Sequence, residues 1–220
     1  MDNNTKTGIM EPSERYSMDE IGLALSAQQG DLNAFNHLVL VHQEMAFNLA
    51  YRMLGDPDLA ADATQNAFIS AYKALPGYRG GSFKSWVMRI VSNTCLDEIR
   101  RQKRRPTTPL EPYDSESEEE IESPAWLADD NPSPEEVLES SELEAAIQNC
   151  LQSMSQDFRL VVVMVDIQGM DYQEAADSTG LPLGTVKSRL ARARGKLRDC
   201  LQFFRELLPD IFRLEGEDTA

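Results

Sequence analysis

The side chains best suited to contact a polyanion lie near the C-terminus, within residues 182–198. This stretch carries six basic residues and no acidic one. A helix with one buried face is predicted here, because apolar residues recur every three or four positions, at Val186, Leu190, Ala193 and Leu197. The opposite face would present groups that bond base edges and phosphates in the major groove of duplex DNA. The candidate contacts are Thr185, Lys187, Ser188, Arg189, Arg192, Arg194 and Lys196, with Arg192 the best candidate for a base.

A second group of residues suited to nucleic acid lies in and after the glycine-containing loop at 77–82. A base held outside the duplex needs an enclosing pocket, and a single strand needs cations and aromatic faces. For Trp86 core packing is the favoured role, and an ion pair of Asp97 with Arg100 or Arg101 would contribute only about 0.2–0.5 kcal/mol. The candidate residues are Arg79, Phe83, Lys84, Trp86, Arg89, Asn93 and Arg100.

The sequence offers no arrangement of catalytic or metal-binding side chains. Its three cysteines, Cys95, Cys150 and Cys200, lie far apart without a CxxC pair, and its only histidines are His37 and His42. We therefore expect no enzyme, no cofactor, no zinc site and no disulfide framework. The two histidines are assigned to a packed helix face.

Both groups of candidate DNA contacts depend on predicted helices for their positions. Apolar residues at three- and four-residue intervals predict an amphipathic helix over 31–54. The alanine-rich run 60–75 predicts a further helix from Pro57, and a third is expected over 83–105, which has no internal glycine or proline and is followed by Pro106. Gly55 ends the first helix, and the Asp56-Pro57 pair caps the second, with proline in the first helical position.

The net charge of −16 is concentrated in the middle of the chain. Residues 107–150 carry 14 acidic residues and no basic one, whereas residues 1–106 carry 12 of each sign. Like charges, prolines and serines over 107–132 predict a flexible acidic linker. Beyond it, Ser133-Pro134 has the residue types of a helix start, and Gly180 provides the turn of a helix-turn-helix motif.

The expected fold is all-α, with two small helical domains joined by the acidic linker. The apolar run at 160–165 would also fit a buried strand, but no partner strand is evident, so helix is expected. No segment approaches the roughly 20 apolar residues of a membrane span, and the N-terminus lacks the pattern of a signal peptide, so we expect a cytoplasmic protein without membrane insertion. The expected parts are a flexible tail at 1–22, a helical domain at 23–106, the linker at 107–132, a helix-turn-helix domain at 133–202 and an extension at 203–220.

The order of these features resembles that of the extracytoplasmic-function (ECF) sigma factors of bacterial RNA polymerase. Residues 184–194 (GTVKSRLARAR) resemble region 4 of that family. Residues 30–35, the run 60–68 (AADATQNAF) and the segment 83–100 resemble region 2, in the same order. The two matches are independent and together cover roughly two thirds of the chain, so they are far more specific than either alone.

The resemblance implies a transcription initiation factor that binds core RNA polymerase and helps to open promoter DNA, without catalysis of its own. In this family, region 2 binds the polymerase clamp helices and captures the minus-ten element as a single strand, and region 4 reads the minus-thirty-five element as duplex. The two candidate DNA-contact groups correspond to these elements. An anti-sigma factor is a further partner that the family implies.

The family's clamp contact maps onto the second predicted helix, at Asp62, Gln65, Asn66 and Phe68. Phe68 fits core packing equally well. Ala61 and Asn66 stand where the family commonly has glutamates, which predicts that two ion pairs to the polymerase are missing here.

Two other functions fit parts of the sequence. A stand-alone helix-turn-helix regulator would use the same C-terminal face on duplex DNA, usually as a dimer, and a helical adaptor would dock its basic helices on acidic proteins. The N-terminal match argues against the first, and the face of Thr185, Ser188 and Arg192 argues against the second.

The linker's acids fit either an imitation of nucleic acid in a cationic polymerase channel or a solvated spacer. The extension at 203–220 fits either completion of the core or docking of a regulator.

Overall fold

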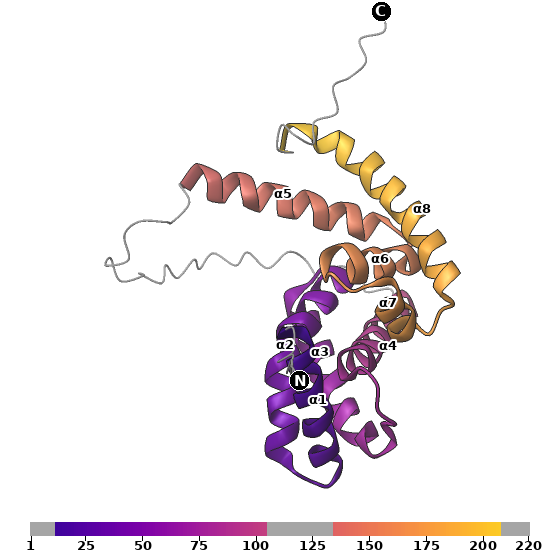
Figure 1. Ribbon diagram of the computed structural model, residues 1–220. Helices are drawn as coiled ribbons and strands as arrows, with labels where there is room; N and C mark the ends of the chain where they lie inside the picture. The colour runs from indigo at the N-terminus through magenta and orange to yellow at the C-terminus, as the bar shows by residue number, and fades with distance from the viewer. Residues whose placement is uncertain (1–11, 105–133, 208–220) are drawn as a thin grey trace, which may run out of the picture.

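The computed structural model describes residues 12–104 and 134–207, and every regular element in these ranges is helical (Figure 1). The predicted all-α fold is thereby confirmed, while the linker predicted at 107–132 and most of the 203–220 extension lie outside the described residues. The helices are α1 (Pro12–Gln28), α2 (Leu32–Leu54), α3 (Pro57–Ala74), α4 (Phe83–Arg104), α5 (Pro134–Ser153), α6 (Gln156–Val162), α7 (Tyr172–Thr179) and α8 (Leu183–Leu201). A π-helical turn, Val163–Ile167, continues α6, and 3₁₀ turns at Leu75–Gly77 and Gln202–Leu207 follow α3 and α8.

The ends of α2 and the start of α3 are set by their capping residues. The Asp31 side chain accepts hydrogen bonds from the first backbone N–H groups of α2, at 2.9 and 3.2 Å. Gly55 ends this helix in the left-handed conformation (φ 81°), which costs glycine little, and its N–H donates to the Tyr51 carbonyl at 2.8 Å. Asp56 then caps α3 by accepting from the N–H of Leu59 at 2.8 Å. These boundaries agree with the sequence prediction.

The N-terminal half, α1 to α4, packs as a bundle around α2, which contacts α1, α3 and α4. Helix α1 begins at Pro12, so the prediction of a flexible tail over residues 1–22 is wrong from Pro12 onward. Buried Ala24 and Ala27 hold it on the bundle. The Gln28 side chain also donates to the carbonyls of Leu75 and Tyr78, at 2.9 and 2.6 Å, and so ties α1 to the turn after α3.

The C-terminal half is built from α5 to α8. The run that fitted either a strand or a helix forms α6 and the π-helical turn, and Val161 to Met164 are fully buried there, so the helical expectation is confirmed. A disulfide joins Cys150 of α5 to Cys200 of α8, with a Cα–Cα distance of 5.8 Å. The expectation of no disulfide is therefore wrong, because the packing of α5 against α8 brings together two cysteines 50 residues apart.

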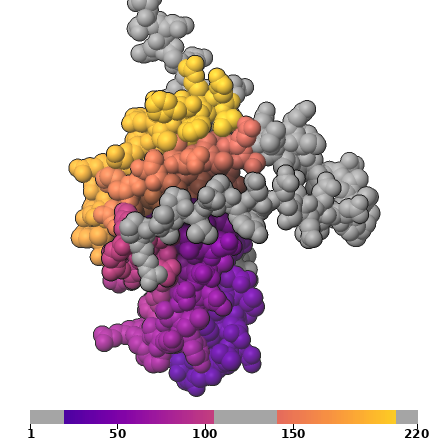
Figure 2. Space-filling model, turned by 180° about the vertical axis from the view of Figure 1, so that it is seen from behind, coloured from indigo at the N-terminus to yellow at the C-terminus, as the bar shows by residue number. Residues whose placement is uncertain are grey.

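The two halves share one continuous hydrophobic core. Helix α7 packs on α4, and α5 and α6 pack on α2. Figure 2 shows the C-terminal helices in yellow and orange lying directly on the N-terminal bundle in purple. Among the described residues, no helix is long and apolar enough to cross a membrane.

Candidate binding surfaces

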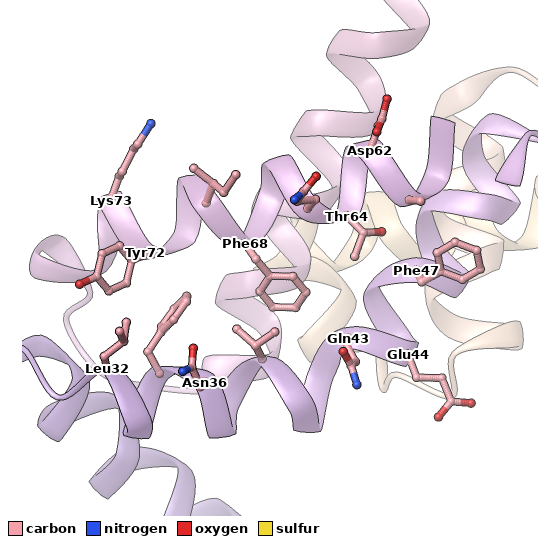
Figure 3. A pocket seen from close by; sticks show the side chains of 15 residues that line it. Leu32, Asn36, Gln43, Glu44, Phe47, Asp62, Thr64, Phe68, Tyr72 and Lys73 are labelled. Carbon is pink, nitrogen blue, oxygen red and sulfur yellow. The ribbon is translucent and has the colours of Figure 1, made fainter. Parts of the chain in front are cut away.

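A groove of about 920 Å³ runs along the outside of the bundle, between α2 and α3 (Figure 3). Three of the four residues that the sequence assigned to a protein contact lie there: Asp62, Gln65 and Phe68. Phe68 is 8% exposed and points between the two helices, so it forms the floor of the groove while it packs in the core. Both roles considered for this residue are therefore compatible.

The walls of the groove include residues that the sequence prediction missed. Helix α2 contributes Phe35, Val39 and Phe47, and α3 contributes Ile69 and Tyr72. Ile69 and Tyr72 are each 45% exposed, which leaves apolar surface without cover in a part of the chain that is well packed elsewhere. Phe35 and Val39 belong to the apolar stripe of the helix predicted over 31–54, so the sequence carried a signal for these two residues.

The chemistry of this groove suits an amphipathic helix from another protein. Apolar rings line its centre, while Glu44, Asp62 and Lys73 lie at its edges. Such a mixture of apolar floor and charged rim is typical of helix-in-groove recognition. Ala61 lies in the same lining, so the glutamate common in the family would add an acid at this rim.

Asn66, the fourth predicted residue, lies apart from the groove. It lines a polar hollow between α3 and α4, together with the acidic and basic side chains of α4. There Arg100 pairs with Asp97 at 2.7 Å and Arg101 with Glu98 at 2.8 Å. The plainer role considered for this face, an ion pair along the helix, is thus present in the structure.

Helices α7 and α8 form the predicted helix-turn-helix. Asp171 and Glu174 make a capping box at the start of α7, and Gly180 ends it in the left-handed conformation (φ 69°). Val186, Leu190 and Ala193 of α8 are at most 2% exposed and face the core of this half. The opposite face of α8 is left on the surface.

The basic side chains on the exposed face of α8 form two groups, those without an acidic partner among the described residues and those paired with an acid. Arg192 has no ion pair or hydrogen bond within the described residues, and Lys187 and Lys196 contact only the rings of Tyr172 and Phe158, at 5.8 and 6.0 Å. Ser188 is exposed and Thr185 is half-buried beside it, with the Ser188 hydroxyl donating to the Thr185 carbonyl at 3.0 Å. These five side chains are available to a ligand.

Arg189 and Arg194 of the same predicted set are held by acids of their own half. Arg189 pairs with Asp157 at 3.3 Å. Arg194 makes two hydrogen bonds to Asp166, at 2.9 and 2.6 Å, which raise the pKa of its guanidinium above the usual range. A phosphate would have to displace these carboxylates, so both residues contribute less attraction than their charge alone implies.

The aromatic residues at the start of α4 form an internal cluster. Phe83 is 1% exposed. The ring centre of the half-buried Trp86 lies 5.4 Å from that of Phe83 and 5.2 Å from that of Tyr78. The core role favoured for Trp86 fits this packing. Phe83 is a core residue in this structure, which contradicts its assignment as a DNA contact, because no face of its ring is open to a base.

Tyr78 is a residue of this region that sequence reasoning missed. Its hydroxyl donates to the Gly81 carbonyl at 2.6 Å and so fixes the loop that leads into α4. Burial and the nearby charge of Glu20 raise the pKa of Tyr78, so this donor stays protonated. The loop therefore has a defined shape from which Arg79 projects into solvent.

The polar residues predicted along α4 are on the surface, with one exception. Arg79, Arg89, Asn93 and Arg100 are exposed. Lys84 instead forms an ion pair with Glu174 of α7, in the other half of the chain. The structure thus leaves Arg89, Asn93 and Arg100 on the surface of α4, whereas Lys84 is half-buried against α7.

The two histidines have different surroundings. His42 is 4% exposed, lies 3.3 Å from Glu20 and packs beside the ring of Phe83, as predicted for a packed face. His37 is exposed, so that prediction is wrong for it. Within residues 12–104 and 134–207, no group of three or more histidine, cysteine or acidic side chains is arranged to hold a metal ion.

Comparison with known protein families divides the chain into the same two parts. Residues 38–105 match the family model of sigma-70 region 2, and residues 144–197 match that of sigma-70, region 4. The first match contains most of the groove and the predicted single-strand surface, and the second contains most of the helix-turn-helix.

Similar proteins cover most of the chain. The ECF RNA polymerase sigma factor SigE of Mycolicibacterium smegmatis is 34% identical over 201 residues, which are 90% of this chain and 72% of that protein. The ECF RNA polymerase sigma-E factor of Escherichia coli K12 is 35% identical over 80% of this chain and 90% of that protein.

Two solved structures share the arrangement of helices. CnrH, solved in complex with the cytosolic domain of CnrY, is 27% identical and has a TM-score of 0.61 over 84% of this chain and 98% of that chain. The sigma factor RpoE of Bartonella quintana, solved with the anti-sigma factor NepR, has a TM-score of 0.57 at 21% identity over 78% of this chain and 98% of that one. The second likeness concerns the fold alone.

Proposed function

Since this chain belongs to the ECF sigma factors of RNA polymerase, we propose that the groove between α2 and α3 binds core polymerase and that α4 and α8 contact promoter DNA. The protein is a transcription initiation factor and not an enzyme. The observation that carries the proposal is the presence, in one chain, of an apolar groove on region 2 and an exposed cationic helix face on region 4.

The polymerase contact is proposed for the groove because its lining fits a helical partner. Phe68 and Phe47 supply apolar depth, and Asp62 and Gln65 supply polar contacts at the rim. In the family, region 2 binds the clamp helices, which are a partner of this kind. Asn66 lies in the polar hollow outside the groove and is therefore assigned a peripheral role.

The minus-thirty-five contact is proposed for the exposed face of α8. Thr185, Ser188 and Arg192 follow one another at spacings of three and four, so they lie on one side of the helix and reach base edges together. Phosphate contacts are assigned to Lys187 and Lys196, and, after release from their acids, to Arg189 and Arg194. Arg192 is the only one of these basic residues for which the described structure gives no partner at all.

The minus-ten contact is proposed for the solvent side of α4 and the loop before it. Arg79, Lys84, Arg89 and Arg100 line the path of a single strand, and Asn93 lies among them with both donors and an acceptor. Trp86 supports this surface from beneath through its packing on Tyr78.

Two further parts of the proposal concern the setting of the protein. It acts in the cytoplasm, where polymerase transcribes the genome. A regulatory protein of the anti-sigma kind is proposed to bind it, because CnrH, the more similar of the two solved structures, was obtained with the cytosolic domain of a second protein.

Reconstituted transcription tests the proposal. The purified chain is added to core polymerase that lacks any sigma factor, with fragments of genomic DNA as template. Initiation at defined sites is expected only when both are present. Tight, sequence-specific binding of duplex DNA by the chain alone, without initiation, would instead indicate a stand-alone regulator.

A further inference from the structure

A covalent link holds the C-terminal end of α8, the helix proposed to contact the minus-thirty-five element. Cys200 lies one residue before α8 ends at Leu201, and its Sγ atom is bonded to that of Cys150 on α5. Disulfides are rare in the cytosol, where glutathione and thioredoxin keep thiols reduced, and those that occur there are usually transient. In the cytoplasmic setting proposed above, this bond is therefore expected to be made and broken.

The two cysteines of this bond differ in their access to solvent. Cys150 is 0% exposed, whereas Cys200 is half-buried and keeps part of its surface in solvent. Exchange begins when a thiolate attacks one sulfur of a disulfide, and access decides which sulfur is attacked. The exposed Lys196 lies one helical turn before Cys200, and its positive charge favours an anionic thiolate there. Attack from solvent is therefore assigned to Cys200.

The part of α8 that carries Cys200 is packed less tightly than the part before it. Val186, Leu190 and Ala193 are the buried residues of this helix. From residue 194 to residue 207, which covers the last two turns of α8 and the 3₁₀ turn, every residue is half-buried or exposed. Segments with few buried contacts open at low cost in free energy. The bond to Cys150 therefore restrains a stretch that packing alone holds weakly.

We propose that the Cys150–Cys200 pair is a reversible thiol-exchange site, at which glutathione or a similar small thiol reacts with Cys200 and thereby sets how firmly the end of α8 is held. The proposal rests on the function proposed above for α8. Lys196 follows Arg192 by four residues, so the two cations lie on the same side of the helix. The oxidised pair keeps Lys196 in place for a phosphate of the duplex. Reduction frees this end of the helix and weakens the contact.

Reduction of the pair takes two steps. A glutathione thiolate attacks the Sγ atom of Cys200, a glutathione–Cys200 bond forms, and the bond to Cys150 breaks. The electron pair leaves on Cys150, which takes up a proton. A second thiolate attacks the glutathione sulfur of this mixed disulfide and releases Cys200, which is also protonated. Two glutathione molecules are thus oxidised to one disulfide, and their two electrons and two protons end on the two cysteines. Oxidised glutathione reverses both steps.

The first experiment measures exchange on the full chain without polymerase. The protein is equilibrated in buffers that run from reduced to oxidised glutathione, is quenched in acid, and is analysed by mass spectrometry after alkylation of the free thiols. Wild type is expected to convert between the two forms within this series. A chain that stays oxidised in reduced glutathione alone would overturn the proposal, because the bond would be a permanent cross-link. A chain that stays reduced in oxidised glutathione alone would overturn it as well.

Two single variants locate the point of attack. Cys150→Ser should capture glutathione on Cys200 when it is treated with oxidised glutathione. Cys200→Ser should react at Cys150 roughly tenfold or more slowly, because a buried thiol reacts only in chains that have opened. Cys95 is a free, buried thiol, so its lack of modification shows that each variant is folded. Equal rates in the two folded variants would overturn the assignment of Cys200.

The second experiment connects exchange to α8. The chain is oxidised or reduced in advance, the glutathione is removed, and run-off transcription is measured with core polymerase on the genomic fragments of the reconstituted assay. The oxidised chain is expected to initiate at least about fivefold more often than the reduced one, the lower end of a typical coupling between two sites. A chain with both Cys150→Ala and Cys200→Ala is the control, since it should give the same activity after either treatment.

Equal or lower activity of the oxidised wild type would overturn the link between the cysteine pair and promoter contact. An absence of initiation in both states would instead count against the proposed function. Exchange with glutathione is measured without polymerase or DNA, so its outcome stands apart from that failure.

Discussion

At the scale of single residues, the cations of α8 carry the same charge but differ in whether an acidic side chain of the protein already pairs with them. Arg189 and Arg194 are equally basic but are paired with Asp157 and Asp166, whereas Arg192 is unpaired within the described residues. The sequence indicated the exposed face of this helix, because its buried positions recur with helical spacing. The pairs left no such signal, since Asp166 lies 28 residues from Arg194.

Arg192→Ala is expected to weaken promoter recognition specifically. A side chain bonded to a base edge contributes about 1–3 kcal/mol, so transcription from closed duplex promoters should fall roughly 5- to 150-fold. A template melted in advance around the minus-ten element should suffer less, because it depends less on upstream recognition. Run-off transcription on both templates measures the difference.

Arg198→Ala is the matched control for Arg192. Arg198 is also exposed on α8, but it lies on a different side of the helix and pairs only with its neighbour Asp199 at 3.4 Å. Its loss should reduce transcription little and equally on both templates. An Arg192→Ala chain that loses the same fraction of activity on both templates would contradict its role in reading duplex DNA.

Cys95 gives a prediction about pH. This thiol is fully buried in α4, and burial raises its pKa from 9.0 to about 12. The unfolded chain ionises near pH 9 while the folded chain keeps its proton, so this group stabilises the fold fully below pH 9 and loses that effect as pH rises toward 12. The loss approaches about 1.4 kcal/mol per pH unit.

Comparison with Cys95→Ala isolates this contribution from that of other alkaline groups. Urea unfolding of both chains at several pH values between 8 and about 11 should show a steeper decline for wild type. Parallel declines would show that Cys95 ionises equally in both states. The same burial predicts that the folded chain protects this thiol from alkylation.

At the scale of elements, capping residues predicted where helices begin and end. They did not predict which helices pack against each other. Gly55 and Asp56 define the end of α2 and the start of α3 through local hydrogen bonds, which is why their sequence signals were sufficient. Helix α1 was missed because its place is set by distant contacts, such as those of Gln28 with Leu75 and Tyr78. The disulfide between α5 and α8 depends on packing in the same way.

The groove between α2 and α3 is expected to contribute to polymerase affinity through Tyr72. Tyr72→Ala removes a ring that packs edge-on against Phe35, with ring centres 5.0 Å apart. An aromatic anchor in an interface contributes about 2 kcal/mol or more, so affinity for core polymerase should fall roughly 30-fold. Leu40→Ala on α2 is the control, because Leu40 is more exposed, at 65%, but lies outside the groove. Equal losses in both chains, in a competition assay for core polymerase, would argue against the groove.

The disulfide is expected to stabilise the C-terminal half. It closes a loop of 50 residues, and by the chain-entropy model such a cross-link contributes about 4 kcal/mol, with 2–4 typical in practice. Addition of a reductant should therefore lower the free energy of unfolding of wild type. A chain with both Cys150→Ala and Cys200→Ala should resemble reduced wild type and should not respond to reductant. A response in that double variant would point to another cause.

At the scale of the whole molecule, the sequence predicted two modules but not their contact. Each module has its own periodic apolar face, which is a local pattern. The contact depends on hydrogen bonds from Gln148, Gln152 and Arg159 to backbone carbonyls of α2. Every residue has a backbone carbonyl, so the sequence of α2 does not indicate which of them are bonded. Lys84 was predicted to face DNA. Its partner Glu174 lies far from it in the sequence, so no local pattern indicated this ion pair.

The acids between the modules give the last prediction. Residues 107–150 carry 14 acidic residues and no basic one, and residues 107–132 lie outside the described residues. If these charges imitate nucleic acid in a cationic channel, replacing Glu118, Glu119 and Glu120 with serine should weaken holoenzyme assembly several-fold at low salt. The loss should shrink as salt rises, because the screening length falls from about 10 Å at 0.1 M to about 3 Å at 1 M.

Replacement of Glu215, Glu217 and Asp218 with serine is the control, since it removes the same charge near the C-terminus. If both triple variants assemble with core polymerase as wild type does at every salt concentration, the acids serve only to keep a spacer solvated. If both weaken equally, net charge and not position matters. Only a loss confined to the central variant assigns these acids a place on the polymerase, because a charge imitates a phosphate only where it meets the cations that hold one.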